Sequence, residues 1–297
     1  MEIKAGSQVI QVKNPDKILY PEDKITKLQV IRYYERIAPL MLPYLKDRPL
    51  TMHRFPDGIN VEGFFQKEVP EYFPQWIEKT RLDNKTGGDT TYLLCQNKET
   101  LLYIAEQACI TPHVWLARYD KPNHPDKIVF DLDPAKPEDF ESVRETALLI
   151  KEKLDRLELN TFIMTTGSKG VHIIIPIERE YPFEQTRLFA QKLAKQIAKN
   201  KPDKITVEQR KEKRKNRLFI DTTRNAYAQT SVAPYSLRAK KGAPIATPIS
   251  WSQLEDENLN AKTYNINNIF KYLDAQKNPW DKIENQVNNL KEAFNKL

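Results

Sequence analysis

Short apolar runs alternate with longer amphipathic stretches along this chain, and the alternation predicts its strands and helices. Residues 128–134 are apolar until two aspartates and a proline end the run, which predicts a buried strand. Residues 171–177 are almost all apolar, which predicts a central strand. Between them, residues 137–157 carry apolar side chains at helical spacing, so we expect an amphipathic helix there.

The same periodicities predict the remaining elements. Strands are expected at residues 49–55, 61–66, 91–95, 161–166 and 218–221, and helices at 27–45, 98–110, 181–200, from 251 onward, and from 281 to Leu297. Pro39 should kink or stop the first helix, and residues 85–89 should form a loop. The order of strand, helix, strand, loop, strand and helix in the middle of the chain indicates a mixed α+β core.

Two aspartates end the predicted strand at 128–134. Because strand side chains alternate between faces, Asp131 and Asp133 should share one face and Leu132 the other. Carboxylates so placed repel each other, and a pair of hard divalent cations would compensate them. On Asp-x-Asp-Pro alone, a surface turn is the competing interpretation. A third acid, Asp221, ends another predicted strand.

A glycine-bounded loop, 167–170, joins two predicted strands. Its backbone N–H groups, the Ser168 hydroxyl and the Lys169 ammonium can all face an anion. It lacks the spacing of a Walker A motif and leads into a strand, which disfavours a P-loop ATPase. Lys169, His172 and Arg238 could neutralise a triphosphate. With three carboxylates, this set suits two-metal phosphoryl chemistry.

Composition narrows the choice of partner. The 297 residues have a formal net charge of +7, which favours a polyanionic partner, although the basic run 208–217 is also typical of a solvated surface. We find no apolar run that could span a bilayer and no signal peptide, so we expect no membrane partner. Cys95 and Cys109 are expected to be reduced, packed thiols of a cytoplasmic protein.

Several motifs together carry a resemblance to a known family. They are Asp16–Glu22 (DKILYPE), Arg48–Leu50 (RPL), Pro56–Gly58 (PDG), Phe64–Lys67 (FFQK), Pro112–Trp115 (PHVW), Phe130–Pro134 (FDLDP), Gly167–His172 (GSKGVH), Ile220–Asn225 (IDTTRN) and Val232–Arg238 (VAPYSLR). Spread over nearly the whole chain and in the same order, they make it similar to the primase-polymerase domain of bacterial and archaeal end-joining ligase D, in the archaeo-eukaryotic primase superfamily.

The resemblance implies a fold and an activity. The fold is α+β, with mixed or antiparallel central sheets flanked by helices and an RRM-like catalytic core. One domain is expected, with an N-terminal part at about 1–120, a catalytic core at about 121–255 and a helical extension at about 256–297. The implied activity is template-directed transfer of nucleotides from nucleoside triphosphates, by a polymerase or primase that uses two Mn²⁺ or Mg²⁺ ions.

The resemblance also implies roles for particular residues. Asp131, Asp133 and Asp221 match the family's catalytic, metal-binding acids. Positions that bind the nucleotide are Thr166, Ser168, Lys169, His172, Arg238 and, near the sugar, His113. Positions that bind DNA are Lys17, Lys27, Phe64, Phe65, Arg224 and Asn225. Among these, Lys17 and Lys27 would grip a downstream 5′-phosphate. Phe64 and Phe65 would stack on template or nucleotide, whereas composition alone slightly favours the core for them.

The implied setting is repair of gapped or broken DNA by non-homologous end joining, close to the nucleoid. A separate DNA ligase and a Ku-like end-binding protein are expected partners, because the resemblance covers the polymerase module alone. Two positions depart from the family pattern: Thr222 replaces a common aromatic, and His53 replaces a common Lys or Arg. A metal-dependent nuclease or phosphoesterase and a catalytically silent DNA-end-binding module are the alternative functions.

Overall fold

The computed structural model describes residues 1–85 and 87–297; Thr86, in the predicted loop 85–89, lies outside the described residues. The chain forms two compact units. The first contains Met1–Asp120, Thr230–Ala246 and Asn265–Asn267, and the second contains Lys121–Gln229, Thr247–Tyr264 and Asn268–Leu297. The predicted single domain with divisions near 120 and 255 stays a prediction.

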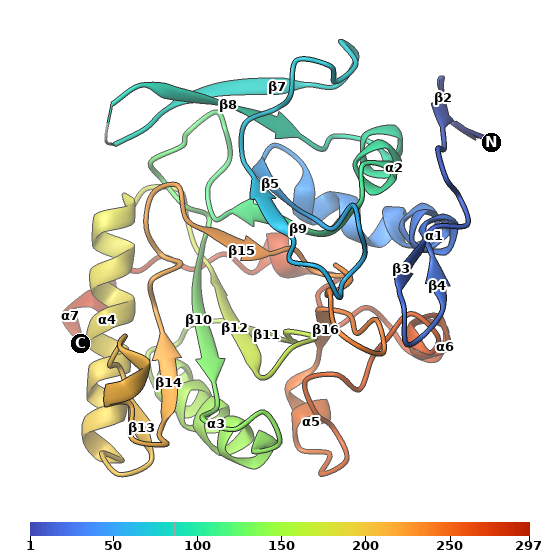
Figure 1. The fold of residues 1–297 in the computed structure, drawn as a ribbon. Helices are drawn as coiled ribbons and strands as arrows, with labels where there is room; N and C mark the ends of the chain where they lie inside the picture. The colour runs from blue at the N-terminus through green and yellow to red at the C-terminus, as the bar shows by residue number, and fades with distance from the viewer. Residues whose placement is uncertain (86) are drawn as a thin grey trace. The chain divides into compact units, whose positions relative to one another are not determined.

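The first unit is built on one large sheet and two small hairpins. The sheet has the strand order β15-β9-β5-β8-β7, and β6 pairs with β5 (Figure 1). Its strands are β5 (Pro49–Arg54), β6 (Phe64–Gln66), β7 (Lys79–Asp83), β8 (Asp89–Leu94), β9 (Cys109–Trp115) and β15 (Thr230–Val232); the hairpins are β1 (Glu2–Ala5) with β2 (Gln8–Gln11), and β3 (Ile18–Tyr20) with β4 (Ile25–Thr26). In the described residues, the paired strands of this unit are antiparallel.

Helix α1 (Lys27–Leu45) begins with a capping box, in which the Thr26 and Gln29 side chains bond each other's backbone N–H. Pro39 and Pro43 both lie inside the helix. Of the predicted kink or stop at Pro39, the stop was therefore wrong, and the kink stays a prediction. Burial of one helix face explains why the helix continues past a missing hydrogen bond. Helix α2 (Lys98–Glu106) ends earlier than predicted because β9 starts at Cys109.

The second unit contains a six-stranded mixed sheet in the order β13-β14-β10-β12-β11-β16. Its strands are β10 (Lys127–Asp133), β11 (Phe162–Thr165), β12 (Val171–Pro176), β13 (Ile205–Thr206), β14 (Leu218–Asp221) and β16 (Thr247–Ile249). Among the described strand pairs of this sheet, β13 and β14 are parallel and the others are antiparallel. The predicted α+β class is confirmed, and β12 is an interior strand as expected.

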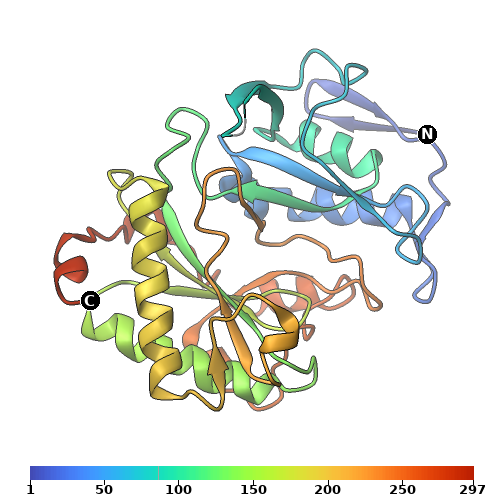
Figure 2. The same cartoon turned by 60° about the vertical axis from the view of Figure 1, so that its left-hand side comes forward.

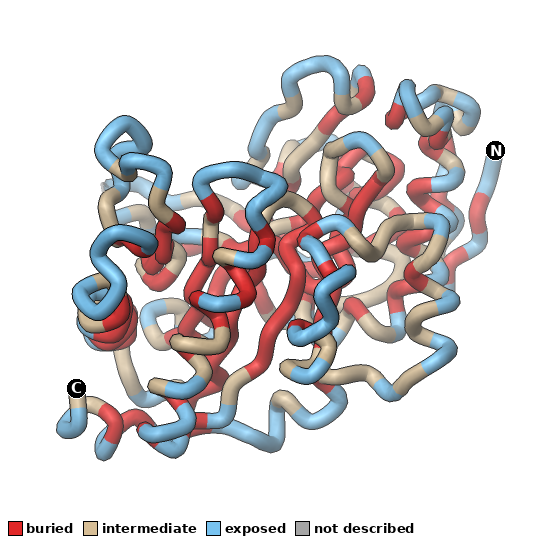
Figure 3. The backbone as a smooth tube through the Cα atoms, turned by 90° about the horizontal axis from the view of Figure 1, so that it is seen from below, coloured by how far each residue is buried: buried red, intermediate tan, exposed pale blue. Residues whose placement is uncertain are grey.

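Helices α3 (Phe140–Arg156) and α4 (Phe183–Asn200) share one hydrophobic core with alternate residues of the sheet (Figure 2). Leu132, Val171 and Ile220 belong to this core. Strand residues are buried along much of their length (Figure 3). Because strand side chains alternate, the neighbours Asp131, His172 and Asp221 point to the face away from this core.

The C-terminal region departs from the predicted long helices. Its helices are short: α5 (Trp251–Leu254), α6 (Ile269–Asp274), the 3₁₀ helix η2 (Ile283–Asn285) and α7 (Lys291–Asn295). Another 3₁₀ helix, η1 (Lys211–Lys213), lies earlier in the chain. Asn288 donates to the carbonyls of Asn160 and Pro176 and accepts from Asn160 N–H, so side-chain bonds hold this segment in a non-helical path. In the described residues, no helix is long and apolar enough to cross a membrane.

Candidate active site

Three polar side chains form a row across neighbouring strands of the second unit. Asp131 on β10 pairs directly with Asp221 on β14 and with His172 on β12. Directly opposed residues of antiparallel strands project from the same face, so the row lies on the face away from the helices. All three side chains are buried. The sheet thus assembles two of the predicted acids and the predicted histidine from distant parts of the chain.

Asp133 extends the row by one strand repeat, since it lies two residues after Asp131 and opposite Phe219. Its pKa is raised, first by burial and then by the negative charges of Asp131 and Asp221, while His172 and Lys169 act in the opposite direction. The strand pairing therefore places the three carboxylates close enough to repel one another. A cation bound there would relieve it.

Asp131 is the centre of the row. Its Oδ1 lies 3.4 Å from His172 Nε2, and its Oδ2 lies 3.8 Å from Arg224 Nε. Asp221 Oδ1 accepts a hydrogen bond of 2.7 Å from the Thr223 backbone N–H. These contacts orient the two carboxylates without the help of the helices behind the sheet.

The loop 167–170 joins β11 to β12, and the Thr166 side chain organises it. Thr166 Oγ1 donates to Gly170 O at 3.0 Å and accepts from the N–H groups of Ser168 (3.2 Å) and Gly170 (3.3 Å). Gly170 lies against β10: a Cβ atom there would be 1.7 Å from Leu132 O. The close approach places the loop beside the strand that carries Asp131 and Asp133.

A cavity of about 220 Å³ adjoins these acids within the second unit. Its lining includes Asp133 and four cations, Lys169, Lys211, Arg214 and Arg217. The Arg214 guanidinium lies 3.7 Å from the centroid of the Phe219 ring, which faces the same way as Asp133. The sequence indicated only a solvated basic run at 208–217; its position directly before the strand that ends in Asp221 was the available signal.

The first unit holds the other predicted nucleotide and template residues. Phe64 and Phe65 are 46% and 58% exposed, so neither belongs to the core that composition slightly favoured. The Phe65 ring stacks on His53, with centroids 4.0 Å apart and 14° between planes, and meets His113 edge-on at 5.4 Å. Burial and the nearby Arg238 charge lower the pKa of His53 to about 4. These aromatic and basic groups therefore form one cluster.

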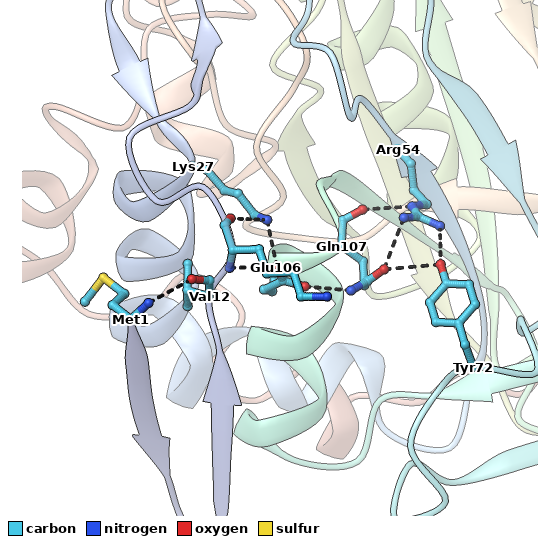
Figure 4. Close-up of polar contacts among 8 residues, drawn as sticks. Met1, Val12, Lys27, Arg54, Tyr72, Glu106 and Gln107 are labelled. Carbon is cyan, nitrogen blue, oxygen red and sulfur yellow. Dashed lines mark hydrogen bonds and ion pairs between the residues drawn. The ribbon is translucent and has the colours of Figure 1, made fainter.

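The two lysines expected at a 5′-phosphate already have acidic partners. Lys17 Nζ bonds Asp57 Oδ1 at 2.8 Å on the surface. Lys27 is buried, and its Nζ bonds both Glu106 Oε1 at 2.7 Å and Lys13 O at 2.9 Å (Figure 4). Their contact with DNA stays a prediction, and a phosphate would have to compete with these carboxylates.

Asn225, another expected DNA contact, is buried and bonded to the backbone. Its side chain accepts from Val129 N–H at 2.8 Å and donates to Val129 O at 2.7 Å. Strand β14 pairs with β10 only from Asp131 to Asp133. The Asn225 side chain therefore provides the hydrogen bonds that β14 does not provide to the Val129 N–H and C=O groups of β10. Its structural role is evident, and its contact with DNA remains untested.

Comparisons with known proteins show the family of this chain and a solved structure with a similar fold. The family described as "LigD, primase-polymerase domain" matches residues 26–280. The chain belongs to the LigD primase-polymerase family. The polymerase domain of Mycobacterium tuberculosis ligase D, solved in complex with DNA, superposes with a TM-score of 0.88 at 27% identity, covering 94% of this chain and 99% of that domain.

Longer members of the LigD family are also similar. The multifunctional non-homologous end joining protein LigD of Mycolicibacterium smegmatis is 33% identical over 252 residues, which cover 84% of this chain and 33% of that protein. Bifunctional LigD of Bacillus subtilis is 29% identical over 272 residues, which cover 91% of this chain and 43% of that protein. The chain thus spans only about a third to two fifths of these relatives.

Metal-dependent catalysis is implied by the family, and such catalysis requires oxygen ligands for divalent cations. In the described part of the chain, no three His, Cys, Asp or Glu side chains are already gathered as a metal-ligand group. The donor chemistry nevertheless fits hard divalent cations, because three carboxylates share one face and the pKa of Asp133 is raised first by burial and then by the charges of the other two. Asp131, Asp133 and Asp221 are the residues that would hold such ions.

Proposed function

We propose that this chain is a template-directed nucleotidyltransferase that adds nucleotides to a 3′-hydroxyl at gapped or broken DNA ends during non-homologous end joining. The observation that carries the proposal is the row of Asp221, Asp131 and His172, continued by Asp133, on one face of the sheet. Membership of the LigD primase-polymerase family supports the same reaction class.

In this proposal the acids bind two divalent cations, Mn²⁺ or Mg²⁺. When bound, the ions supply Lewis-acid chemistry that lowers the pKa of the attacking hydroxyl and balances charge on the departing pyrophosphate. Arg224 and His172 hold the Asp131 carboxylate in orientation through their contacts with its two oxygens. The Asp131 carboxylate is thus oriented before substrate arrives, which reduces reorganisation during the reaction.

The triphosphate would bind beside the acids, at the loop 167–170. Ser168 offers a hydroxyl and Lys169 an ammonium there, while the Ser168 N–H already donates to Thr166 Oγ1. Lys169 also lines the cavity with Lys211, Arg214 and Arg217, and this positive lining favours phosphate groups over a neutral ligand. Arg238 and His113 are also proposed as nucleotide contacts.

DNA is the proposed second substrate. The M. tuberculosis domain was solved in complex with DNA. This chain carries a formal net charge of +7 and presents Phe64 and Phe65 to solvent, a combination suited to phosphate attraction and base stacking. Lys17 and Lys27 are proposed for a downstream 5′-phosphate, and a DNA ligase activity would seal the product.

The proposal is tested by primer extension on a gapped duplex whose downstream strand has a 5′-phosphate. Wild-type protein, Asp131→Ala and the exposed-acid control Asp155→Ala are compared with Mn²⁺ or Mg²⁺ and with ribo- or deoxynucleoside triphosphates. Templated addition by wild type and by the control, lost in Asp131→Ala while DNA binding persists, is the expected result. Normal extension by Asp131→Ala would show that Asp131 is not a catalytic, metal-binding residue.

The same assay separates the alternative functions. Release of nucleotides from DNA without added triphosphates would indicate a nuclease or phosphoesterase. Salt-sensitive DNA binding without addition under any condition would indicate an end-binding module.

A further inference from the structure

Tyr72 presents its ring to solvent but has a fixed hydroxyl. The residue is 62% exposed. Its hydroxyl donates to Gln107 Oε1 at 3.2 Å and accepts from Arg54 Nη1 at 3.1 Å (Figure 4). Its ring also meets the buried Phe73 ring edge-on, with centroids 5.2 Å apart. These three contacts restrict the side-chain rotamers of Tyr72, so little further conformational entropy is lost if the ring binds a ligand.

Arg54 links this ring to the exposed Phe64. The Arg54 Cζ atom lies 5.5 Å from the centroid of the Phe64 ring, while Nη1 reaches Tyr72. The guanidinium is itself held by the Gln107 carbonyl (Nε, 2.8 Å) and by Gln66 Oε1 (Nη1, 2.7 Å). One fixed cation therefore touches two exposed aromatic side chains.

Behind these surface groups is a buried anchor. Gln107 Nε2 donates to Glu106 Oε2 at 2.6 Å, and Glu106 Oε1 accepts from Lys27 at 2.7 Å (Figure 4). Glu106 and Lys27 are both buried, so the chain of bonds leads from the surface ring into the packed interior of the first unit. This anchoring gives Tyr72 a defined orientation rather than a mobile one.

We propose that Tyr72 is a third stacking ring, which holds an unpaired template base beyond those on Phe64 and Phe65, with Arg54 as its positioning residue. This inference rests on the proposed function. An exposed, immobilised aromatic ring binds a base at little entropic cost, and the adjacent guanidinium attracts the backbone phosphate between bases. The combination fits single-stranded nucleic acid better than an apolar protein partner, because the surface between the rings is charged.

The test uses gapped duplexes with 2-aminopurine at successive unpaired template positions. Stacking on Tyr72 should quench the fluorescence of 2-aminopurine at a single template position, farther from the primer than the base next to it. Tyr72→Ala should restore the fluorescence at that position. Loss of one stacked base should weaken binding of the gapped duplex about fivefold or more. Tyr72→Trp should retain quenching, and Tyr72→Phe should retain part of it because the ring stays while its tethers are lost. Tyr119→Ala, an exposed tyrosine outside this network, is the matched control.

Extension kinetics give a second readout. Tyr72→Ala should raise the KM for gapped DNA and leave kcat nearly unchanged, because the ring binds template away from the reacting atoms. Unchanged quenching and affinity in Tyr72→Ala, or equal losses in Tyr119→Ala, would overturn the inference. Because these are binding measurements, they decide the role of Tyr72 even if the wild type adds no nucleotide, a result that would count against the proposed function alone.

Discussion

Lys27 Nζ lies 2.7 Å from Glu106 Oε1, and both side chains are buried. The lysine that the family resemblance assigns to a DNA 5′-phosphate therefore carries its own neutralising carboxylate. Glu106 also accepts from the Lys13 backbone N–H at 3.3 Å, so it fixes the segment before α1 as well. Removing its charge should affect both phosphate preference and stability.

Glu106→Gln should increase the preference for a 5′-phosphate over a 5′-hydroxyl at the gap. The Lys27 charge would no longer be neutralised, and we expect a gain of about fivefold in the ratio of the two dissociation constants, equivalent to roughly 1 kcal/mol. The buried contacts would be imperfectly replaced, so the free energy of unfolding should fall by about 1–3 kcal/mol. Fluorescence anisotropy on the two duplexes and denaturant unfolding measure these effects.

The control for this experiment is Glu35→Gln, because Glu35 forms a more exposed pair with Arg32 on the same unit. It should alter neither quantity appreciably. If Glu106→Gln leaves the phosphate preference unchanged, Lys27 is not a phosphate ligand in this protein and Lys17 is the remaining candidate.

His53 should make stability depend on pH. Burial and the Arg238 charge lower its folded-state pKa to about 4 from the ordinary value of 6.5. The unfolded chain then binds more protons between these values, so stability is full above pH 6.5 and is lost as the pH falls toward 4. The loss should be roughly 1–3 kcal/mol, since the side chain is only partly buried and solvent screens it. Urea unfolding at several pH values from 4 to 7 gives the free energy of unfolding as a function of pH. This free energy should change less with pH in His53→Gln than in the wild type, and an equal change in both would contradict the prediction.

Asn225→Ala should destabilise the strand that bears the acids. The substitution leaves Val129 N–H and C=O without their partners at 2.8 and 2.7 Å, at a cost of about 2–4 kcal/mol. Asn225→Asp should also be destabilising, because a carboxylate cannot donate to the Val129 carbonyl. Thermal unfolding measures both, with the more exposed Asn258→Ala as control. A stability equal to wild type, combined with weaker DNA binding, would favour a direct contact of Asn225 with DNA.

Gly170→Ala should be disruptive because of space rather than backbone conformation. A Cβ atom would lie 1.7 Å from Leu132 O, so β10 or the loop must move, at a cost of about 2 kcal/mol or more. Gly242→Ala is the contrasting control: its φ of +84° is strained, but the space is open, and about 1 kcal/mol is expected. Circular dichroism melts compare the two, and equal effects would show that the close approach relaxes easily.

The sequence by itself determined the strands and helices of the central region and the face on which each acid lies. Strand β10, helix α3, strand β12 and helix α4 occur where apolar periodicity predicted them. The shared face of Asp131 and Asp133 follows from strand alternation, which is a local property of two residues. The resemblance to the LigD primase-polymerase domain was also present in the motifs alone and is confirmed.

The sequence was less reliable where local and tertiary preferences compete. Pro39 did not end α1, and the C-terminal apolar pattern did not produce a long helix, because side-chain bonds from Asn288 hold that segment in another path. A single helical period cannot reveal such long-range bonds.

Only the tertiary structure decided which side chains meet. The pairing of Asp131 with Asp221 and His172, the Glu106 partner of Lys27 and the Arg54 contacts of Tyr72 all join segments that are separated along the chain. Likewise, Asn225 supports Val129 across 96 residues of sequence. Strand order and register set the pairing of the acids, and the packing of helices and loops sets the other contacts. Local periodicity contains no information about which elements become neighbours.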